Sequence, residues 1–414
     1  MSVLAERNAD IACTSFFDEM SPDYPVETVT EGKASLIVPR LDPEAEEHIQ
    51  QQRSQAPVFY NTVMKTNRDT AVLALRAYQR KKSRNVQVCE PMTGSGVRGI
   101  RLILEAGEIN DMVLGDLNPT ALSLARENAK LNGVNDRIKF RELDANLLMA
   151  LHSYPFGRFD YIDVDPYGTP TPFYDTAVRA TKNHGVIAIT ATDMPPLCGV
   201  NVRACIRKYG GYPLRGEFCH ETALRLLASS FIRQAAIHEY AATPLFSYYA
   251  DHYVRAYYRI DKGARRIETQ LNQFGFIKYC PSCLHRFPSM ENAPERCECG
   301  EEMNIGGPLW LGELSDEAFL GEMIEEINEA PHISGTKAEG IMNLARDEIG
   351  FPVSFYDIDK ICKQVSVKSV STEDAFNDII GAGFKAVPTH YGTRSLKTDA
   401  SMSDLFEVFS RFKA

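Results

Sequence analysis

A regular alternation of short apolar strands and amphipathic helices between residues 86 and 190 is the feature that most constrains the fold. Parallel strands need a crossover between them, and the usual crossover is a helix. The alternation therefore predicts an α/β domain of Rossmann-like type, with a parallel sheet and helices on both faces. The predicted strands are 86–90, 112–116, 138–143, 159–164 and 185–190, and the predicted helices are 100–105, 119–132 and 173–181.

The rest of the chain is less regular and suggests a second domain. A chain of 414 residues exceeds one ordinary core, and its character changes near Asp261-Lys262-Gly263. We expect one domain over 1–262 and a smaller, mainly helical α+β domain over 263–414. Further predicted elements are a strand at 33–40, a helix at 70–80 preceded by Asn67–Asp69, helices at 336–348, 356–365 and 371–380, and a hairpin at 385–397. The last four resemble a winged-helix-like module, which could bind nucleic acid or serve only for packing.

Composition and charge set the broad class of protein. The chain is 44% hydrophobic and 24% charged, which is typical of a soluble globular protein. It contains no apolar run of membrane-spanning length and no signal-type stretch in its first thirty residues, so we expect a cytoplasmic protein with no membrane contact. The net charge is −10, but residues 201–270 hold eleven Lys/Arg against six Asp/Glu, and a local basic face is sufficient for nucleic acid. No obligate protein partner is evident.

A glycine turn follows the first predicted strand, in Glu90-Pro-Met-Thr-Gly94-Ser-Gly96-Val-Arg-Gly99. The spacing matches the dinucleotide fingerprint, and it equally matches the S-adenosylmethionine turn, in which an acid ends the strand before Gly-x-Gly. In both cases glycine lets the backbone approach the ligand closely. We therefore take Glu90, Gly94 and Gly96 as candidate cofactor residues, with both cofactor types open at this point.

The next two strands end in carboxylates. Asp116 ends the second strand and could accept hydrogen bonds from two ribose hydroxyls, which suits either cofactor. Asp144 ends the third strand and could accept from an adenine amine, which favours S-adenosylmethionine over a nicotinamide cofactor. The alternative for Asp144 is a helix cap.

The fourth strand ends in Asp165-Pro166-Tyr167-Gly168, which resembles the Asp/Asn-Pro-x-aromatic motif of amino-methyltransferases. A base amine is a poor nucleophile because its lone pair is delocalised into the ring. The Asp165 carboxylate and the Pro166 carbonyl could accept its N–H groups and stabilise the positive charge that develops on nitrogen. Tyr167 offers a ring on which an extruded base could stack. The alternative is an ordinary turn, since all four residues favour turns.

These residues predict an S-adenosylmethionine-dependent methyltransferase that modifies a base amine, with Asp165, Pro166 and Tyr167 as catalytic residues. Two other classes remain open on the residues alone. One is methylation of adenine N6 in RNA or DNA, and the other is an NAD-dependent oxidoreductase, which rests only on the glycine fingerprint.

Several longer segments resemble the tRNA (guanine(26)-N2)-dimethyltransferase family in its archaeal form. The resemblance is strong over residues 30–265 and weaker in the tail. The matching segments are 31–34, 57–61, 67–69, 94–99, 165–168, 190–199, 214–221 and 251–255.

The resemblance implies methylation of guanine N2 at position 26 of tRNA, to the mono- and then the dimethyl form. It also implies tRNA as partner, an RNA-associated C-terminal domain, and Asp165 as catalytic acid. S-adenosylmethionine would be bound by residues matching Arg68, Arg98, Asp116, Asp144 and Ala145. Either arginine could pair with the methionine carboxylate, or could instead form a structural ion pair. Tyr167 stands where the family commonly has Phe.

Four of the ten cysteines cluster as Cys280-Pro-Ser-Cys283 and Cys297-Glu-Cys299. In a reducing compartment such a cluster suggests a metal rather than disulfides, and four thiolates suit tetrahedral Zn²⁺. The second pair is one residue shorter than the usual spacing. We expect a structural zinc knuckle with these four ligands and no open position.

Three further features allow two interpretations each. Asp193 could border the base pocket or cap a turn. His220 and Glu221 could support the site, or His220 could be a buried, paired histidine. The aromatic and basic stretch 248–259 could be an RNA surface or a plain sheet strand, and its alternation slightly favours the strand.

Overall fold

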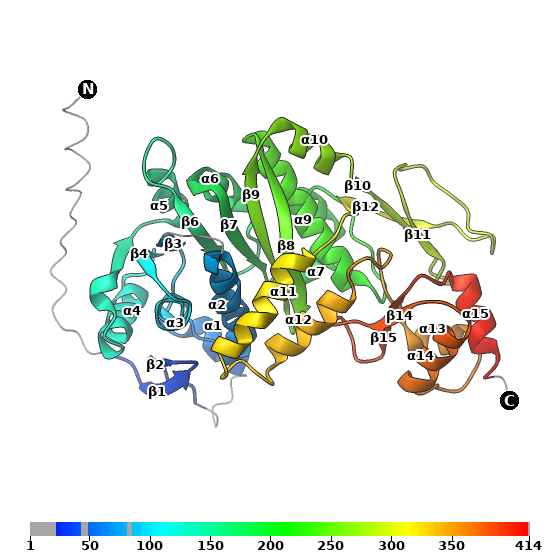
Figure 1. Cartoon of the computed structure of the whole chain (residues 1–414), viewed down its shortest axis with the longest axis horizontal. Coiled ribbons are helices and arrows are strands. Elements are labelled where there is room, and N and C mark those ends of the chain that lie inside the picture. The colour runs from blue at the N-terminus through cyan, green and yellow to red at the C-terminus, as the bar shows by residue number, and fades with distance from the viewer. Residues whose placement is uncertain (1–21, 43–48, 81–84, 413–414) are drawn as a thin grey trace.

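The computed structural model describes residues 22–42, 49–80 and 85–412. Its centre is a seven-stranded sheet in the order β5-β4-β3-β6-β7-β9-β8, with helices on both faces (Figure 1). The strands from β5 to β7 are parallel, and β9 pairs antiparallel with β7 and with β8. The strands are β3 (Val86–Glu90), β4 (Ile109–Asp116), β5 (Ile138–Glu142), β6 (Phe159–Val164), β7 (Thr181–Ala191), β8 (Tyr240–Ala250) and β9 (Tyr253–Lys262). The predicted Rossmann-like α/β fold is thus confirmed.

Two apolar cores lie on opposite faces of this sheet because successive strand residues point to opposite sides. Tyr161 and Ala188 pack in one core, while their neighbours Ile162 and Ile187 pack in the other. The first core is covered by α2 (Lys65–Arg80), α3 (Val97–Glu105), α4 (Pro119–Leu131), α11 (Glu317–Glu325) and α12 (Lys337–Asp347). The second is covered by α5 (Ala145–Leu151), α6 (Tyr174–Ala180), α7 (Met194–Leu197), α8 (Val202–Tyr209) and α9 (Cys219–Ile237).

Helix α2 begins earlier than predicted. We expected Asn67–Asp69 to precede a helix at residue 70, but the helix starts at Lys65 and includes them. The reason lies upstream: the Asn61 side chain caps the short 3₁₀ helix η1 (Thr62–Met64), and η1 runs directly into α2. As a result Asn67 and Arg68 project from a rigid, buried helix rather than from a loop.

An N-terminal hairpin of β1 (Val26–Glu31) and β2 (Ala34–Pro39) packs beside α3 and α4. Its turn contains Gly32 at φ +58°. A Cβ atom there would lie 2.2 Å from Glu105 Oε1 and 2.7 Å from Arg101 Nε, so only glycine fits between the hairpin and this ion pair. The short helix α1 (Ile49–Gln55) follows the hairpin.

Two small antiparallel sheets complete the C-terminal part. The first consists of β10 (Phe274–Tyr279), β11 (Arg286–Ser289) and β12 (Asn304–Trp310). The second, with β13 (Tyr356–Asp357), β14 (Ala386–Pro388) and β15 (Ser395–Thr398), lies with α13 (Ile358–Val365), α14 (Thr372–Gly381) and α15 (Met402–Ser410). The predicted hairpin is present as β14–β15, whereas the sequence interpretation missed α15. The remaining helices are α10 (Ala264–Leu271), η2 (Asn135–Arg137), η3 (Thr171–Phe173) and η4 (Glu326–Glu329).

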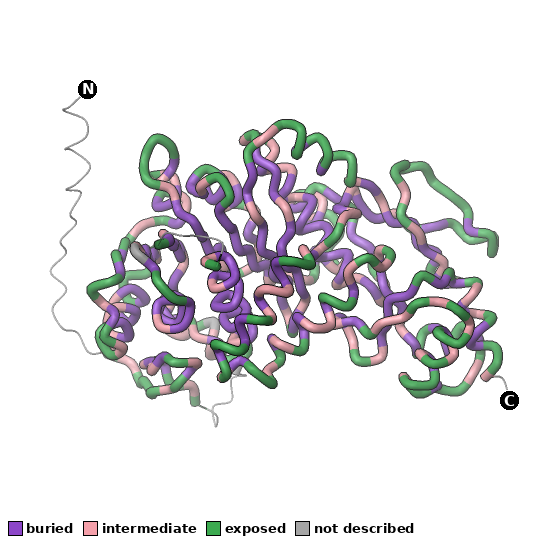
Figure 2. The backbone as a smooth tube through the Cα atoms, in the orientation of Figure 1, coloured by how far each residue is buried: buried purple, intermediate pink, exposed green. Residues whose placement is uncertain are grey.

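Helices α11 and α12 lie beyond the predicted domain boundary at residues 262/263 and yet pack on α2. Arg76 Nε donates to Glu326 Oε2 at 2.6 Å, and Arg80 also pairs with Glu326. The inner strands of the central sheet are mostly buried beneath these layers, whereas the edge strand β5 is partly exposed (Figure 2). Among residues 22–42, 49–80 and 85–412, none of the helices combines the length and apolar character that a bilayer span requires.

Candidate active site

The carboxylates predicted from the strand ends meet at one edge of the sheet. Glu90 ends β3, Asp116 ends β4, Asp144 follows β5, and Asp165 follows β6. These four strands are neighbours in the order β5-β4-β3-β6 and run parallel, so their carboxyl ends lie side by side. In open α/β sheets, ligands bind at this edge.

The glycine turn connects β3 closely to its neighbours. The Gly94 N–H donates to Asp116 Oδ2 at 2.9 Å. Gly96 has φ +78°, and a Cβ atom there would lie 2.9 Å from the Cβ of Ala125 in α4. Helix α3 begins directly after Gly96, which has no side chain to cap it, and among the described residues Glu90 accepts only the Gly99 N–H of its first turn. The other amide groups at this end of α3 are therefore available to a negatively charged ligand group.

Glu90 lies beneath this turn. Its Oε2 accepts the Thr93 hydroxyl at 3.0 Å and the Gly99 N–H at 3.1 Å. Burial raises the pKa of Glu90 to about 7, although the Arg98 guanidinium opposes the rise. The glycine turn thus contains a carboxyl group that changes charge near neutral pH.

The carboxylates of Asp116 and Asp144 both accept hydrogen bonds from backbone amides and can still accept further ones. Asp116 accepts the amides of Gly94 and Asn118, one on each oxygen, at 2.9 Å. Asp144 Oδ1 accepts the amides of Asn146 at 2.9 Å and of Leu147 at 3.1 Å, so Asp144 is the N-cap of α5. A carboxylate oxygen can accept more than one hydrogen bond, so neither contact excludes a ligand. Ala145, the first residue of α5, is buried beside them.

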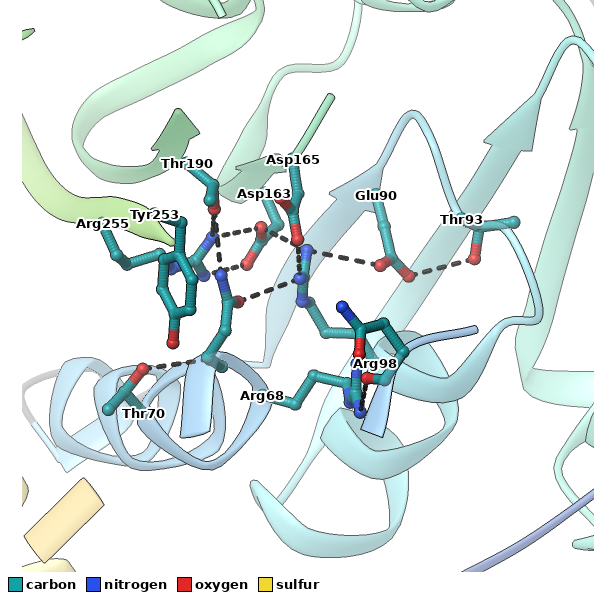
Figure 3. A network of polar contacts seen from close by, with 12 residues as sticks. Arg68, Thr70, Glu90, Thr93, Arg98, Asp163, Asp165, Thr190, Tyr253 and Arg255 are labelled. Carbon is teal, nitrogen blue, oxygen red and sulfur yellow. Dashed lines mark hydrogen bonds and ion pairs between the residues drawn. The ribbon is translucent and has the colours of Figure 1, made fainter. Parts of the chain in front are cut away.

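A buried network of arginines and carboxylates lies beneath Asp165 (Figure 3). Arg98 donates to Asp163 Oδ1 at 2.6 Å and to Asn67 Oδ1 at 3.0 Å, and its Nη2 also pairs with Asp165. Arg255 binds both oxygens of Asp163, at 2.8 and 2.6 Å. Burial would raise the pKa of Asp163, but the two arginines outweigh it and lower that pKa. Asp163 is therefore the anion that holds both arginines in place. We call these five residues the Arg98 network.

The Arg98 network is open toward the sheet edge. Asp165 is partly exposed, with 15% of its side chain accessible. The Nε of Arg98 is buried and has no hydrogen-bond partner among the described residues. A buried donor without a partner costs about 1–3 kcal/mol, so it is a natural site for a ligand acceptor.

Arg68 belongs to a separate cluster. Its guanidinium binds both oxygens of Glu31, at 2.6 and 2.5 Å, and its Nη2 donates to the carbonyl of Asn61 at 3.0 Å. Glu31 also accepts from Arg101 at 2.9 Å. Burial would raise the pKa of Glu31, but the two arginines lower it to about 2. Arg68 thus forms a structural ion pair, which was one of the two roles that the sequence allowed. A role for Arg68 in cofactor binding stays a prediction.

The segment from Asp165 to Gly168 is both a tight turn and an accessible motif. Gly168 donates its N–H to Thr192 Oγ1 at 2.8 Å and accepts the Thr192 N–H at 2.9 Å, which ties the turn to the end of β7. Pro166 is buried, whereas Tyr167 is 89% exposed. A large aromatic ring this exposed is free to stack on a planar ligand.

Sequence reasoning missed Asn67, Asp163, Thr190 and Arg255 as parts of the site. Thr190 Oγ1 accepts from Arg255 at 2.8 Å and from Asn67 at 3.1 Å. A signal was present in β6, where every residue is buried and yet Asp163 is charged. A carboxylate at such a position needs a buried cation, and only tertiary structure shows that β9 supplies it.

The other candidates have plain structural roles. Asp193 accepts from Lys208 Nζ at 2.9 Å and pairs with the Tyr209 hydroxyl. Residues 248–259 lie mostly in the buried strands β8 and β9, so the sheet-strand interpretation is correct. Glu221 is buried and bound by Arg225 at 2.7 Å and by Lys397 at 2.8 Å.

The four clustered cysteines converge beside the β10–β12 sheet. Their sulfur atoms all lie within 4.8 Å of one another. Cys280 Sγ is 3.5 Å from Cys299 Sγ, and Cys283 Sγ is 3.3 Å from Cys297 Sγ. Tetrahedral zinc ligands with Zn–S bonds near 2.3 Å lie about 3.8 Å apart, so this donor set fits such an ion after small shifts.

The chain is similar to known proteins over most of its length. The N2,N2-dimethylguanosine tRNA methyltransferase family profile matches residues 40–410. A tRNA (guanine(26)-N(2))-dimethyltransferase of Methanothermobacter thermautotrophicus is 36% identical over 386 residues, covering 92% of this chain and 98% of that protein. A tRNA (guanine(26)-N(2)/guanine(27)-N(2))-dimethyltransferase of Aquifex aeolicus is 34% identical, with coverages of 92% and 95%. Trm1 from Pyrococcus horikoshii, solved with S-adenosyl-L-methionine, is 31% identical with a TM-score of 0.79, covering 92% of this chain and 99% of that one.

Proposed function

The chain belongs to the N2,N2-dimethylguanosine tRNA methyltransferase family, and from this premise we propose that it methylates N2 of guanine 26 in tRNA. The methyl donor is S-adenosylmethionine, and the products are N2-methylguanine and N2,N2-dimethylguanine. The observation that carries the proposal is the open Arg98 network, which presents Asp165 and an exposed Tyr167 at the ligand-binding edge of the sheet.

The residues of this edge fit the methyl donor. Asp116 would accept hydrogen bonds from the ribose hydroxyls, and Asp144, with Ala145 beside it, would accept from the adenine amine. The Nε of Arg98, which has no partner among the described residues, and the amides of Val97 and Arg98 at the start of α3 would attract the methionine carboxylate. When bound, S-adenosylmethionine supplies an electrophilic methyl group on a sulfonium sulfur.

Asp165 is proposed to activate the base. Its carboxylate, with the Pro166 carbonyl, would accept the N–H groups of the guanine N2 amine and orient the nitrogen lone pair toward the methyl group. As the N–C bond formed and the bond between the methyl carbon and the sulfonium sulfur broke, positive charge would grow on nitrogen until the amine lost a proton. The Asp165 carboxylate would stabilise that charge, and a neutral thioether would leave. Arg98 holds Asp165 in place from below, so the charge that stabilises the amine is positioned before the base arrives.

Tyr167 is proposed to stack on the base. A guanine in a folded tRNA must leave its stack to reach a methyl group at the sheet edge, and an exposed ring offsets part of that cost. Gly168 has φ +88°, a conformation that favours glycine, and its hydrogen bonds to Thr192 hold the turn that carries the ring. The family's more common Phe would stack equally well.

We also propose that Cys280, Cys283, Cys297 and Cys299 bind a structural Zn²⁺. The set contains four thiols and leaves no ligand position for substrate, which suits a structural ion. The ion would stabilise the loops around β10–β12, where a small sheet has little apolar core of its own.

The division into a methyltransferase domain over 1–262 and an RNA-associated domain over 263–414 is likewise a proposal. The winged-helix-like arrangement would comprise α12–α14 with the hairpin β14–β15. Limited proteolysis near residues 262/263 would test the boundary. The packing of α11 and α12 on α2 makes residues 346–355 the alternative boundary.

A pair of tRNA transcripts tests the proposed activity. One carries guanine at position 26 and the other adenine, and each is incubated with the protein and a methyl-labelled donor. We expect label only in the first transcript. Equal labelling of both would show a different target, and label on adenine would indicate N6 methylation. Calorimetry with S-adenosylmethionine and with NAD separates the cofactor classes, since we expect heat of binding from the first alone.

A further inference from the structure

A second group of soft metal ligands lies apart from the four clustered cysteines, at the end of α7 and the start of α9. Cys198 is the C-cap of α7, and Cys219 and His220 are the first two residues of α9. The two sulfurs and a ring nitrogen of His220 all lie within 4.8 Å of one another. Cys198 lies 21 positions before Cys219, and this spacing alone suggests no site.

We propose that Cys198, Cys219 and His220 form a second metal site, which binds Zn²⁺ through two sulfurs and one imidazole nitrogen. Among the described residues no fourth Cys, His, Asp or Glu joins the group. The site would therefore keep one position for water. The inference concerns metal binding alone and does not depend on the proposed methylation.

The spacing of the three ligand atoms fits this ion. Tetrahedral Zn²⁺ with bonds near 2.3 Å to sulfur and near 2.0 Å to nitrogen places its ligands about 3.5–3.8 Å apart. The three ligand atoms lie within 4.8 Å of one another, so a shift of about 1 Å would complete the geometry. All three residues are partly buried, so the ion would be shielded from bulk water but still reachable.

His220 is oriented as a ligand rather than as a hydrogen-bonded core residue. Its ring stacks on Tyr249, with centroids 3.8 Å apart and planes at 7°. Tyr249 is in turn held by its N–H, which donates to His390 Nε2 at 3.3 Å. No hydrogen bond from a His220 ring nitrogen to another described residue is found. The ring is therefore fixed in orientation while its nitrogens stay available, an arrangement that suits a metal ligand.

The two cysteines also suit metal binding. Cys219 begins a helix of 19 residues, and the positive end of that helix stabilises a thiolate. The Cys198 thiol contacts the Cys219 carbonyl at 3.9 Å, which is a weak interaction that a metal bond would replace. The nearby Glu217 would not serve as a further ligand to the ion, because Arg286 and the Tyr279 hydroxyl already bind its carboxylate.

The position of the site gives it a structural consequence. Cys198 follows the loop that leaves β7, and Thr192 at the start of that loop is bonded to Gly168 of the catalytic turn. Cys219 and His220 precede Glu221, which binds Lys397 of the C-terminal part at 2.8 Å. A bound ion would tie the loop beside the catalytic turn to the helix that anchors the C-terminal sheet. We infer a positioning role for the ion.

Metal analysis of the full chain, purified under reducing conditions without chelator, tests the inference. We expect two zinc ions per chain in the wild type and one in Cys198→Ser. Cys205→Ala is the matched control: this buried cysteine lies on the adjacent helix α8, belongs to neither group, and should leave two ions. The site would also be supported if the wild type held one zinc ion and Cys198→Ser held none. The proposal would be overturned if the wild type and Cys198→Ser held the same number of ions, whether two, one or none.

Zinc release from the wild type provides a test that needs no variant. A coloured chelator should remove zinc in two phases of equal amplitude, fast from the open three-ligand site and slow from the four-cysteine site. His220→Gln should remove the fast phase if Cys198→Ser does not fold. A single slow phase in the wild type would contradict the inference. Mass spectrometry that finds a disulfide between Cys198 and Cys219 after purification under reducing conditions would also contradict it, because a disulfide cannot bind the ion.

Discussion

Two buried networks of arginines and carboxylates lie a few residues apart on α2 and α3, and they differ in one respect. In the cluster around Arg101, all the guanidinium nitrogens donate: to Glu31, Asp69 and Glu105 at 2.7–2.9 Å. In the Arg98 network, one nitrogen finds no partner in the described part of the chain, and one carboxylate is partly exposed. The closed cluster connects the N-terminal hairpin to α2 and α3, whereas the open network faces the ligand edge of the sheet. We therefore expect completeness of pairing to separate the structural cluster from the proposed catalytic one.

The largest expected effect is loss of activity in the open network. Asp165→Ala should lower methyl transfer by at least about 10³-fold, because the charge that stabilises the amine is removed. Binding of S-adenosylmethionine and the urea midpoint should change little, since Arg98 keeps Asp163 and Asn67. Asp165→Asn keeps an acceptor without the charge, so its rate of methyl transfer should lie between those of the wild type and Asp165→Ala. Asp175→Ala, a surface carboxylate on α6, is the control and should retain full activity. Equal activity in Asp165→Ala and the control would remove Asp165 from catalysis.

The closed cluster should show the opposite pattern, a loss of stability. Arg101→Met leaves three buried carboxylates without their shared cation and should cost about 3–5 kcal/mol of unfolding free energy. At temperatures where the variant is still folded, its turnover should stay close to that of the wild type. If Arg101→Met were as stable as the wild type but inactive, the assignment of a purely structural role to this cluster would be wrong.

Arg98→Lys tests the geometry of the open network. A lysine keeps the positive charge but cannot contact Asp163, Asn67 and Asp165 with a rigid planar fork. We expect roughly 10–100-fold lower kcat, as for a misplaced catalytic group, with unfolding affected less than in Arg101→Met. Unchanged kcat would show that Asp165 does not need this support.

Glu90, which lies beside Arg98, and Glu31 of the closed cluster should respond to pH with opposite sign. Because the pKa of Glu90 is raised to about 7, the folded protein binds more protons than the unfolded chain between pH 4.5 and 7, and this residue makes stability fall as pH rises. Glu31, with a pKa lowered to about 2, contributes stability above pH 4.5 that is lost as pH falls toward 2. Urea titrations at several pH values measure both. Relative to the wild type, Glu90→Gln should gain on the order of 1 kcal/mol from pH 5 to pH 8; a flat difference would contradict the assignment.

Tyr167 carries the smallest expected effect, because it belongs to neither network. Tyr167→Phe retains the ring and should change kcat/KM by less than about 2-fold, whereas Tyr167→Ala should lose about 1–3 kcal/mol of base stacking. The loss should appear mainly in KM for tRNA, with the affinity for S-adenosylmethionine unchanged. Identical kinetics for the two variants would show that the exposed ring does not contact the base.

The sequence predicted the sheet and its carboxylate edge because both follow from local patterns. The strand–helix alternation located Glu90, Asp116, Asp144 and Asp165, and parallel pairing then placed them together. The sequence could not predict that Asp163 and Arg255 pair, because the two residues are 92 positions apart. They meet only because β9 joins the sheet antiparallel beside β7. The sequence analysis assigned no element after the hairpin, although the buried residues Met402, Leu405 and Val408 of α15 recur at helical spacing.

Mass spectrometry of nucleosides from unmodified tRNA, incubated with the protein and S-adenosylmethionine, tests the central claim most directly. We predict N2-methylguanine followed by N2,N2-dimethylguanine at position 26 with the wild-type protein, and neither product with Asp165→Ala. Methylation confined to another base, or the same products from Asp165→Ala, would contradict the account.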